Sequence, residues 1–180
     1  MCGIAGYIEF KKDALSKGRP VDVLEKMMTS INHRGPDDYG MSFYGYDNGT
    51  GVDPSKVKFS TGTDCGIALG HKRLSIIDLS ENGRQPMSNS VNDLEIIFNG
   101  EIYNYIELRE ELSEIKFRTQ TDTEVLIAAY EKWGIDMLNK FDGMFAFVLF
   151  DKKRNKLICA RDAVGIKPFY FNYSNNGFVF

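Results

Sequence analysis

The residue with the most reactive side chain, Cys2, directly follows the initiator methionine in the opening stretch MCGIAGYIEF. A free α-amine has a reference pKa near 8 and a cysteine thiol one of about 8.5, so at neutral pH each group is close to its reactive form. Once Met1 is removed, both groups belong to one residue, and the amine can accept the thiol proton directly or through a water molecule. Taken alone, the dipeptide fits equally well a small apolar residue that happens to come second, and this plainer interpretation is the commoner one.

The remaining cysteines and the two histidines exclude other kinds of site. Cys2, Cys65 and Cys159 are scattered, odd in number and without a CxxC pair, which argues against a disulfide framework and for a reducing, cytoplasmic setting. His33 and His71 have no metal-ligand spacing, so no zinc site is expected. We expect Cys65 and Cys159 to be inert core residues in apolar strands.

Length and composition indicate one globular domain. The chain has 180 residues, of which 43% are hydrophobic and 26% charged, enough apolar side chains for a buried core. The net charge of −3 is too small to favour nucleic acid or an anionic membrane as a partner. We find no secretory signal and no apolar stretch long enough to span a bilayer.

Hydrophobic periodicity predicts an α/β domain in which long strands are covered by two main helices. Thr121 to Glu124 form a capping-box pattern, and Gly134 stands where a helix C-terminal glycine belongs. From Gly143 onward we expect successive antiparallel strands. The last of them stops at Phe180 without a turn, which suggests that the chain continues in a longer protein. The predicted strands are 2–10, 41–46, 65–78, 94–104, 144–151, 156–162, 169–173 and 178–180, and the predicted helices 21–33, 106–113 and 124–133.

Seven strings occur in order along the chain: MCGIAGY, HRGPDDYG, ALGHKRLSIID, FNGEIYN, TDTEVL, FDGMFAFVLFD and ARDAVGIKPFYF. Together they resemble, over essentially the full length, the N-terminal glutaminase domain of class II glutamine amidotransferases, whose nucleophile is the N-terminal residue. The resemblance implies an N-terminal nucleophile hydrolase fold, a four-layer αββα sandwich of antiparallel sheets. It also implies that residues 1–180 form one glutaminase domain that hydrolyses glutamine to glutamate and ammonia.

By this resemblance Cys2, as the first residue of the processed chain, attacks the glutamine carboxamide to form a thioester. The Asn99 side-chain amide and the Gly100 backbone N–H match the family's oxyanion hole. The glycine would let the backbone come close to the substrate. Without the resemblance, Asn99-Gly100 is the strongest short signal of a hairpin turn.

The same resemblance assigns the residues that would hold the amino-acid end of glutamine. Arg73 matches the arginine that binds the carboxylate, where a planar guanidinium gives two parallel hydrogen bonds that Lys72 could not give. Asp122 matches the ligand of the ammonium group, although Asp at a helix start is also favoured by the helix dipole. Glu101 is expected to assist at the same ammonium.

Several neighbouring residues receive secondary roles from the resemblance. Leu74, Ile76 and Ile77 line or support the glutamine pocket, with core packing as the alternative. The HRGPD turn, which holds His33, Arg34 and Asp37, is interpreted as architecture that holds the chain start. His71 is interpreted as structural.

The residues after Arg73 and the GIKPFY string are most similar to the asparagine synthetase branch, so asparagine is the leading product. No SGGxDS-type pyrophosphate loop is present, so we expect no cofactor in this domain, with ATP and Mg²⁺ confined to a synthetase domain that follows Phe180. The expected partners are L-glutamine and that C-terminal domain, with no nucleic acid and no membrane, and a homodimer is left open. Two alternatives remain: a catalytically silent domain of the same fold, and the glutaminase half of an amidotransferase for polysaccharide or peptide amidation.

Overall fold

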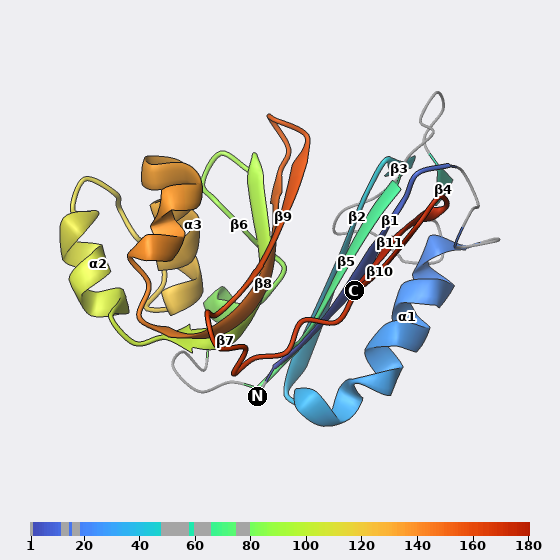
Figure 1. Ribbon diagram of the computed structural model, residues 1–180, viewed down its shortest axis with the longest axis horizontal. Coiled ribbons are helices and arrows are strands. Elements are labelled where there is room, and N and C mark those ends of the chain that lie inside the picture. Colours follow the sequence, from blue (N-terminus) through green and yellow to red (C-terminus); the bar gives the residue numbers. More distant parts are fainter. Residues whose placement is uncertain (1, 12–14, 16–18, 48–57, 60–65, 75–79) are drawn as a thin grey trace.

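The computed structural model describes the chain except for residues 1, 12–14, 16–18, 48–57, 60–65 and 75–79. Two antiparallel sheets face each other, and helices cover their outer faces, so the described elements form the αββα sandwich expected from the resemblance (Figure 1). The two larger sheets contain strands β1 Gly3–Glu9, β2 Asp38–Tyr44, β5 Gly66–Arg73, β6 Met87–Ser88, β7 Leu94–Ile102, β8 Gly143–Asp151, β9 Lys156–Arg161, β10 Asn172–Ser174 and β11 Gly177–Val179. The α-helices are α1 Pro20–Ser30, α2 Tyr105–Glu111 and α3 Asp122–Trp133, and a small separate sheet pairs β3 Tyr46–Asp47 with β4 Lys58–Phe59.

The first sheet has the strand order β10-β11-β1-β5-β2, and α1 lies on its outer face. Helix α1 begins at Pro20, whose fixed φ and missing N–H suit a first helical position. Its residues Val21, Leu24 and Met28 recur at helical spacing and are buried against Ala5 and other apolar residues of this sheet. The apolar residues whose spacing predicted this helix are therefore the ones that form its face against the sheet.

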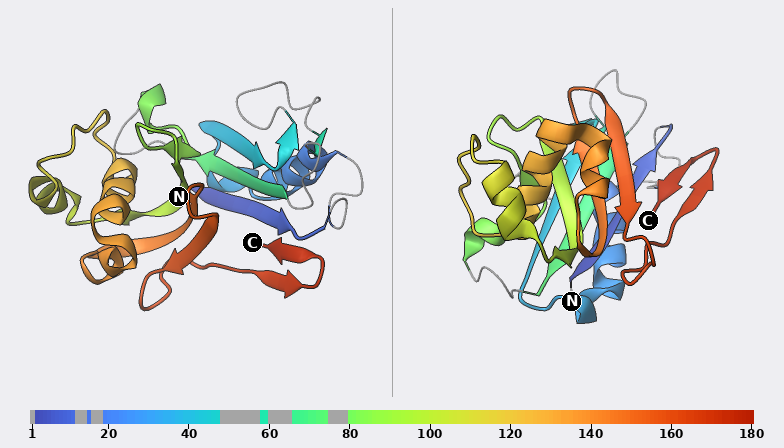
Figure 2. Two further views of the ribbon diagram at one scale, coloured as in Figure 1. Left: turned by 90° about the horizontal axis from the view of Figure 1, so that it is seen from above. Right: turned by 60° about the vertical axis from the view of Figure 1, so that its left-hand side comes forward.

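The second sheet has the strand order β6-β7-β8-β9, with α2 and α3 on its outer face (Figures 1 and 2). Helix α3 is capped by Thr121, whose Oγ1 accepts a hydrogen bond from the Glu124 N–H at 3.3 Å. The helix ends at Gly134, which has a φ of 58° that favours glycine. Both ends of α3 thus follow the prediction.

The facing sides of the two sheets form an apolar layer. Ile67 and Leu69 of β5 pack with Ile97 of β7 and with Val148 and Phe150 of β8. Because side chains alternate along a strand, His71 and Arg73 also fall on this inward side of β5. The same alternation that builds the core therefore directs polar residues at the end of β5 between the sheets.

Three sequence expectations need correction. Strand β5 ends at Arg73, and residues 75–78 of the predicted strand lie outside the described part. Strands β10 and β11 do not continue the β8–β9 meander but join β1 in the first sheet, because β11 pairs with β1 from Tyr7 to Glu9. Cys159 is exposed rather than in the core, whereas Cys65 lies outside the described residues.

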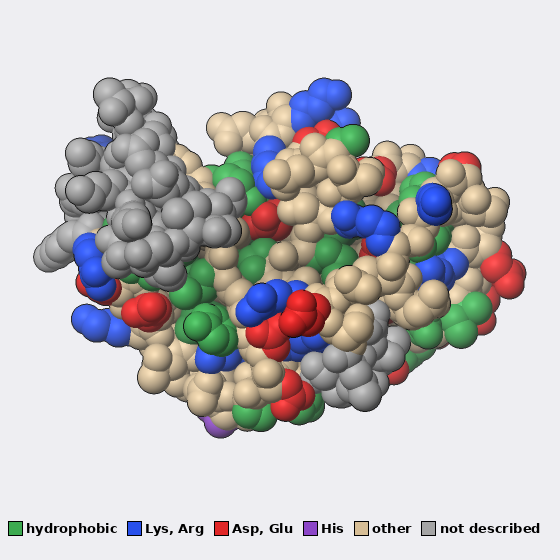
Figure 3. Space-filling model, turned by 180° about the vertical axis from the view of Figure 1, so that it is seen from behind, with side chains coloured by type: hydrophobic (Ala, Val, Ile, Leu, Met, Phe, Trp, Pro, Cys, Tyr) green, Lys and Arg blue, Asp and Glu red, His purple; other side chains and the backbone are tan. Residues whose placement is uncertain are grey.

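The surface has no large field of one charge on the face seen in Figure 3. There, acidic and basic side chains are intermingled, and hydrophobic side chains show in small separate areas. None of the described helices is long and apolar enough to cross a membrane.

Candidate active site

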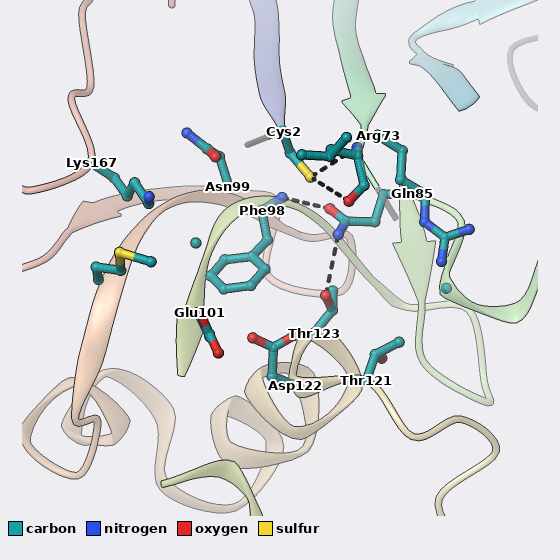
Figure 4. Close-up of a pocket in the computed structure, with 14 residues that line it drawn as sticks. Cys2, Arg73, Gln85, Phe98, Asn99, Glu101, Thr121, Asp122, Thr123 and Lys167 are labelled. Atoms are coloured by element: carbon teal, nitrogen blue, oxygen red, sulfur yellow. Dashed lines mark hydrogen bonds between the residues drawn. The ribbon is translucent and has the colours of Figure 1, made fainter. Parts of the chain in front are cut away.

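Cys2 lies immediately before β1 and is partly buried. The Leu74 N–H donates to its Sγ at 3.4 Å, and its thiol donates to the Leu74 carbonyl oxygen at 3.7 Å (Figure 4). The N–H can remain bonded to a thiolate, whereas the carbonyl can pair only with a protonated thiol. The backbone of Leu74 therefore fixes the sulfur in either protonation state.

The HRGPD turn packs against the end of β5 and the start of β1. A Cβ at Gly35 would lie 2.5 Å from the carbonyl carbon of Lys72, and the Asp37 N–H donates to the Arg73 carbonyl oxygen at 3.1 Å. Lys72 is the β5 partner of Gly3. The turn therefore supports the strand on which the chain start is laid, which agrees with the architectural role expected for it.

Asn99 and Gly100 lie within β7, paired with Ala146 and Phe145 of β8, and do not form the hairpin turn that the dipeptide alone favours. Asn99 is buried, and its Oδ1 has no hydrogen-bond partner among the described residues. A buried side-chain amide that is not tied into the fold is available to a ligand. A Cβ at Gly100 would lie 2.3 Å from the Met144 carbonyl oxygen, so a glycine is also required here for β7 to pair with β8.

Arg73 is the last residue of β5, and its guanidinium is buried beside the loop that follows. Its Nη1 donates to the Ser80 carbonyl oxygen at 2.8 Å. A Cβ at Gly83 would lie 2.2 Å from Arg73 Nη2 and 3.3 Å from Thr121 Cγ2. Gly83 therefore makes room for the guanidinium next to the first turn of α3, where Asp122 begins the helix.

Asp122 is buried, and its Oδ2 accepts a hydrogen bond from the Ile102 N–H at 3.1 Å. Burial raises the pKa of Asp122 to about 6, the backbone N–H groups of Ile102 and Thr123 oppose this rise, and the nearby Glu101 carboxylate adds to it. A carboxylate held in this way gains from any cation that enters the pocket.

One pocket brings together the predicted residues Cys2, Arg73, Leu74, Asn99, Gly100, Glu101 and Asp122. These residues come from separate segments of the chain, and Figure 4 shows the labelled ones around a common space. Ile76 and Ile77 lie outside the described residues. His33, Arg34, Asp37 and His71 do not line the pocket.

The sequence reasoning missed the other lining residues, which are Gly83, Gln85, Phe98, Thr121, Thr123, Met144 and Lys167. Lys167 is a buried cation, 3% exposed, that follows a loop organised by Asp162. The Asp162 carboxylate accepts from the N–H groups of Phe145, Ile166 and Lys167 at 3.1, 2.8 and 2.9 Å. Lys167 belongs to the GIKPFY string, which supported the resemblance without drawing attention to this position.

The described part of the chain contains no set of side chains that could bind a metal ion. No group of three or more His, Cys, Asp or Glu side chains there is arranged to hold an ion. The pocket offers a thiol, amide donors, a guanidinium and carboxylates, which together suit nucleophilic attack on a small zwitterionic substrate.

Comparison with known protein families shows to which family the chain belongs. The family model for the glutamine amidotransferase domain matches residues 1–180. The chain belongs to this family. This glutamine amidotransferase domain is 42% identical over 183 residues to asparagine synthetase [glutamine-hydrolyzing] 1 of Bacillus subtilis, covering 100% of the chain and 25% of that relative. It is also 36% identical to amidase chry2 of Gibberella zeae, covering 98% of the chain and 25% of that relative.

A solved structure supports the fold independently. The glutamine phosphoribosylpyrophosphate amidotransferase from B. subtilis, complexed with ADP and GMP, superposes with a TM-score of 0.73 at 21% identity. The match covers 98% of the glutamine amidotransferase domain and 41% of that chain. The domain thus spans about a quarter of the length of the two curated relatives named above.

Proposed function

We propose that this glutamine amidotransferase domain hydrolyses glutamine to glutamate and ammonia, with Cys2 as the nucleophile after Met1 has been removed. The observation that carries the proposal is the shared pocket of Cys2, Arg73, Asn99, Gly100 and Asp122. Each of these residues has a purely structural explanation when taken alone. Their convergence supports a single catalytic function for all of them.

The proposed reaction starts with transfer of the Cys2 thiol proton to its own α-amine. The sulfur adds to the side-chain carbonyl carbon of glutamine, and the negative charge develops on the carbonyl oxygen. Asn99 and the Gly100 N–H are the donors proposed to stabilise this oxyanion. The carbon–nitrogen bond then breaks, the leaving nitrogen takes the proton from the α-ammonium, and ammonia departs from a thioester. Water adds to the thioester, the sulfur leaves and recovers a proton, and glutamate is released.

The amino-acid end of glutamine is proposed to lie between Arg73 and Asp122. The guanidinium would bind the α-carboxylate, and Asp122 with Glu101 would bind the α-ammonium. The contact geometry at Gly83 supports this pairing because it places the Arg73 guanidinium beside Thr121, the residue before Asp122. Leu74, Ile76 and Ile77 are proposed to support the same pocket.

The ammonia is proposed to serve an ATP-dependent amide-forming domain that follows residue 180 in the full-length protein, with asparagine as the product. The B. subtilis relative, which is about four times as long as this match and is named a glutamine-hydrolysing asparagine synthetase, supports this assignment. The amidase chry2 relative favours a second candidate, in which another acceptor receives the ammonia. Confinement of ATP and Mg²⁺ to the downstream domain and a cytoplasmic location remain part of the proposal, and a homodimer is left open.

The direct test is glutamate release from glutamine by the chain with Met1 removed, compared with two cysteine variants. Cys2→Ala should lower the rate by at least about 1,000-fold, because the nucleophile is lost. Cys159→Ala, which changes an exposed cysteine on β9, should keep the wild-type rate. Chains shown by mass to retain Met1 should be inactive.

A fully processed chain that releases no glutamate would overturn the proposal in favour of a silent domain of the same fold. Activity that survives Cys2→Ala would assign the reaction to another residue. Turnover by uniformly Met1-bearing chains would refute the role of the α-amine.

A further inference from the structure

Phe98, the residue before Asn99, has its two backbone polar groups held by side chains rather than by a neighbouring strand. In the β6–β7 pairing, Met87 lies opposite Ile96 and Ser88 opposite Glu95. Continued in the same register, the pairing would bring Gln85 opposite Phe98, but β6 begins only at Met87. The Gln85 side chain takes the place of the missing ladder bond: the Phe98 N–H donates to Gln85 Oε1 at 2.6 Å.

The carbonyl of Phe98 is held from the other sheet. His71 of β5 is fully buried, and its Nε2 lies 3.1 Å from the Phe98 carbonyl oxygen. A carbonyl oxygen can only accept, so Nε2 carries the proton and donates it to Phe98. Burial lowers the pKa of His71 to about 4, which keeps the ring neutral and the donor in place at neutral pH.

Gln85 also connects the Phe98 backbone to the opposite wall of the pocket. Its Nε2 donates to Thr123 Oγ1 at 3.2 Å, in the first turn of α3 and next to Asp122 (Figure 4). The Gln85 backbone can approach the first sheet because Gly40 has no side chain: a Cβ there would lie 2.2 Å from the Gln85 carbonyl oxygen. One buried side chain thus bridges the strand that carries Asn99 and the helix that carries Asp122.

We propose that Gln85 and His71 are positioning residues for the oxyanion site. They hold the N–H and the carbonyl of Phe98, one in each of the two peptide groups that flank its Cα, and the backbone fixed in this way sets where the Asn99 amide and the Gly100 N–H stand relative to the Cys2 sulfur. Oxyanion donors act only when they are preorganised at the correct place. Small rotations of the backbone at Phe98 therefore reduce the rate of glutamine hydrolysis, while the amino-acid end of glutamine, which binds farther away, remains bound. This inference rests on the proposed glutaminase function.

The test compares Gln85→Met with Gln120→Met, since the same substitution at exposed Gln120 removes an amide that does not line the pocket. In glutamine hydrolysis by the processed chain, Gln85→Met should lower kcat by about 10- to 100-fold and change KM by less than about threefold. Gln120→Met should leave both constants unchanged. A second pair at His71 covers the case in which Gln85→Met does not fold: His71→Leu should lower kcat about tenfold or more, and His71→Gln, which keeps a donor of similar reach, should restore most of it.

A tetrahedral analogue separates positioning from general damage. With the aldehyde analogue of glutamine, the Cys2 sulfur adds to the aldehyde carbon and the thiol proton ends on the new oxygen, which occupies the oxyanion site. Across the variants, the inhibition constant of this aldehyde should rise in proportion to the loss of kcat/KM. The KM for glutamine should not follow it.

Three results are decisive. A wild-type chain that hydrolyses glutamine while Gln85→Met and His71→Leu keep their kcat overturns this inference and leaves the proposed function intact. Losses that fall on KM, with the aldehyde constant unchanged, assign the two residues a structural role only and overturn it as well. A processed wild-type chain without glutaminase activity refutes the proposed function itself, and the positioning role is refuted with it.

Discussion

Two buried carboxylates in this domain are equally hidden from solvent but are treated in opposite ways by the fold. Glu95 and Asp122 are each 5% exposed. Glu95, on β7, accepts hydrogen bonds from Ser42, Tyr44 and Ser88, and Lys152 Nζ lies 3.8 Å from its Oε2. Asp122, among the described residues, accepts from backbone N–H groups only and has Glu101 as its charged neighbour.

This difference contrasts a structural carboxylate, Glu95, with the carboxylate that we propose binds the substrate ammonium, Asp122. The Glu95 cluster joins β2 of one sheet to β7 of the other, and its hydroxyl and ammonium donors satisfy the charge inside the protein. Burial and the Glu95 carboxylate raise the pKa of Tyr44, which keeps its hydroxyl as a donor in this cluster. Asp122 lacks such side-chain donors, so its charge is stabilised fully only when a cationic group of a ligand arrives.

Within this comparison, the largest expected effect is that of Asp122→Asn on catalysis. Removing the charge that would bind the substrate ammonium should lower kcat/KM for glutamine by roughly 30- to 1,000-fold, which corresponds to about 2–4 kcal/mol. Steady-state kinetics at pH 7.5 measure it. A change smaller than about threefold would mean that Asp122 does not hold the ammonium group.

The pH dependence of glutamine hydrolysis should show the ionisation of the same carboxylate. Asp122 must be ionised to bind a cation, and its pKa is raised to about 6, so below pH 6 kcat/KM should fall by about an additional tenfold per pH unit, beyond the loss caused by protonation of the Cys2 α-amine. The Asp122→Asn variant should lose this additional fall. A wild-type profile that stays flat down to pH 5 would contradict the assignment.

The same replacement of carboxylate by amide should change stability in opposite directions at the two sites. Because the folded-state pKa of Asp122 lies above its usual value, its stabilising contribution is present below about pH 4 and is lost as the pH rises through about 6. At pH 7.5, Asp122→Asn should therefore raise the free energy of unfolding by roughly 1–3 kcal/mol. Glu95→Gln should lower it by roughly 1–3 kcal/mol, because charge-assisted hydrogen bonds are lost.

Urea unfolding of the two variants beside the wild-type chain measures this contrast. Glu95→Gln should also keep the KM for glutamine within about twofold, because its cluster lies outside the pocket. If both variants lose stability, Asp122 is a structural residue like Glu95 and the comparison fails.

Local sequence patterns predicted the parts of the fold that depend on local physics. The spacing of Val21, Leu24 and Met28 gave α1, and Thr121 with Gly134 marked the ends of α3. The pattern could not assign β10 and β11 to a sheet, because any antiparallel strand with suitable alternation can pair with more than one edge. Cys159 was misplaced for a related reason: an apolar run predicts a strand but not which of its faces is covered.

The residues of the candidate site can also be divided into those that the sequence identified and those that depend on the three-dimensional structure. Resemblance to a known family identified the residues that the pocket brings together, such as Cys2, Arg73 and Asp122. Gln85 was missed because its meaning depends on contacts with Phe98 and Thr123, far away in the sequence. Lys167 was missed because a lysine in a loop is usually exposed, and only the Asp162 turn brings this one into the pocket wall.

The central claim is that Cys2, as the first residue of the processed chain, is the nucleophile of this pocket. The most direct measurement treats the processed chain with a glutamine analogue that carries an electrophilic ketone in place of the carboxamide, and locates the adduct by mass spectrometry of peptides. We predict a single adduct on the N-terminal peptide, absent in Cys2→Ala and suppressed by excess glutamine. An unlabelled N-terminal peptide, or labelling that glutamine does not suppress, would contradict the account.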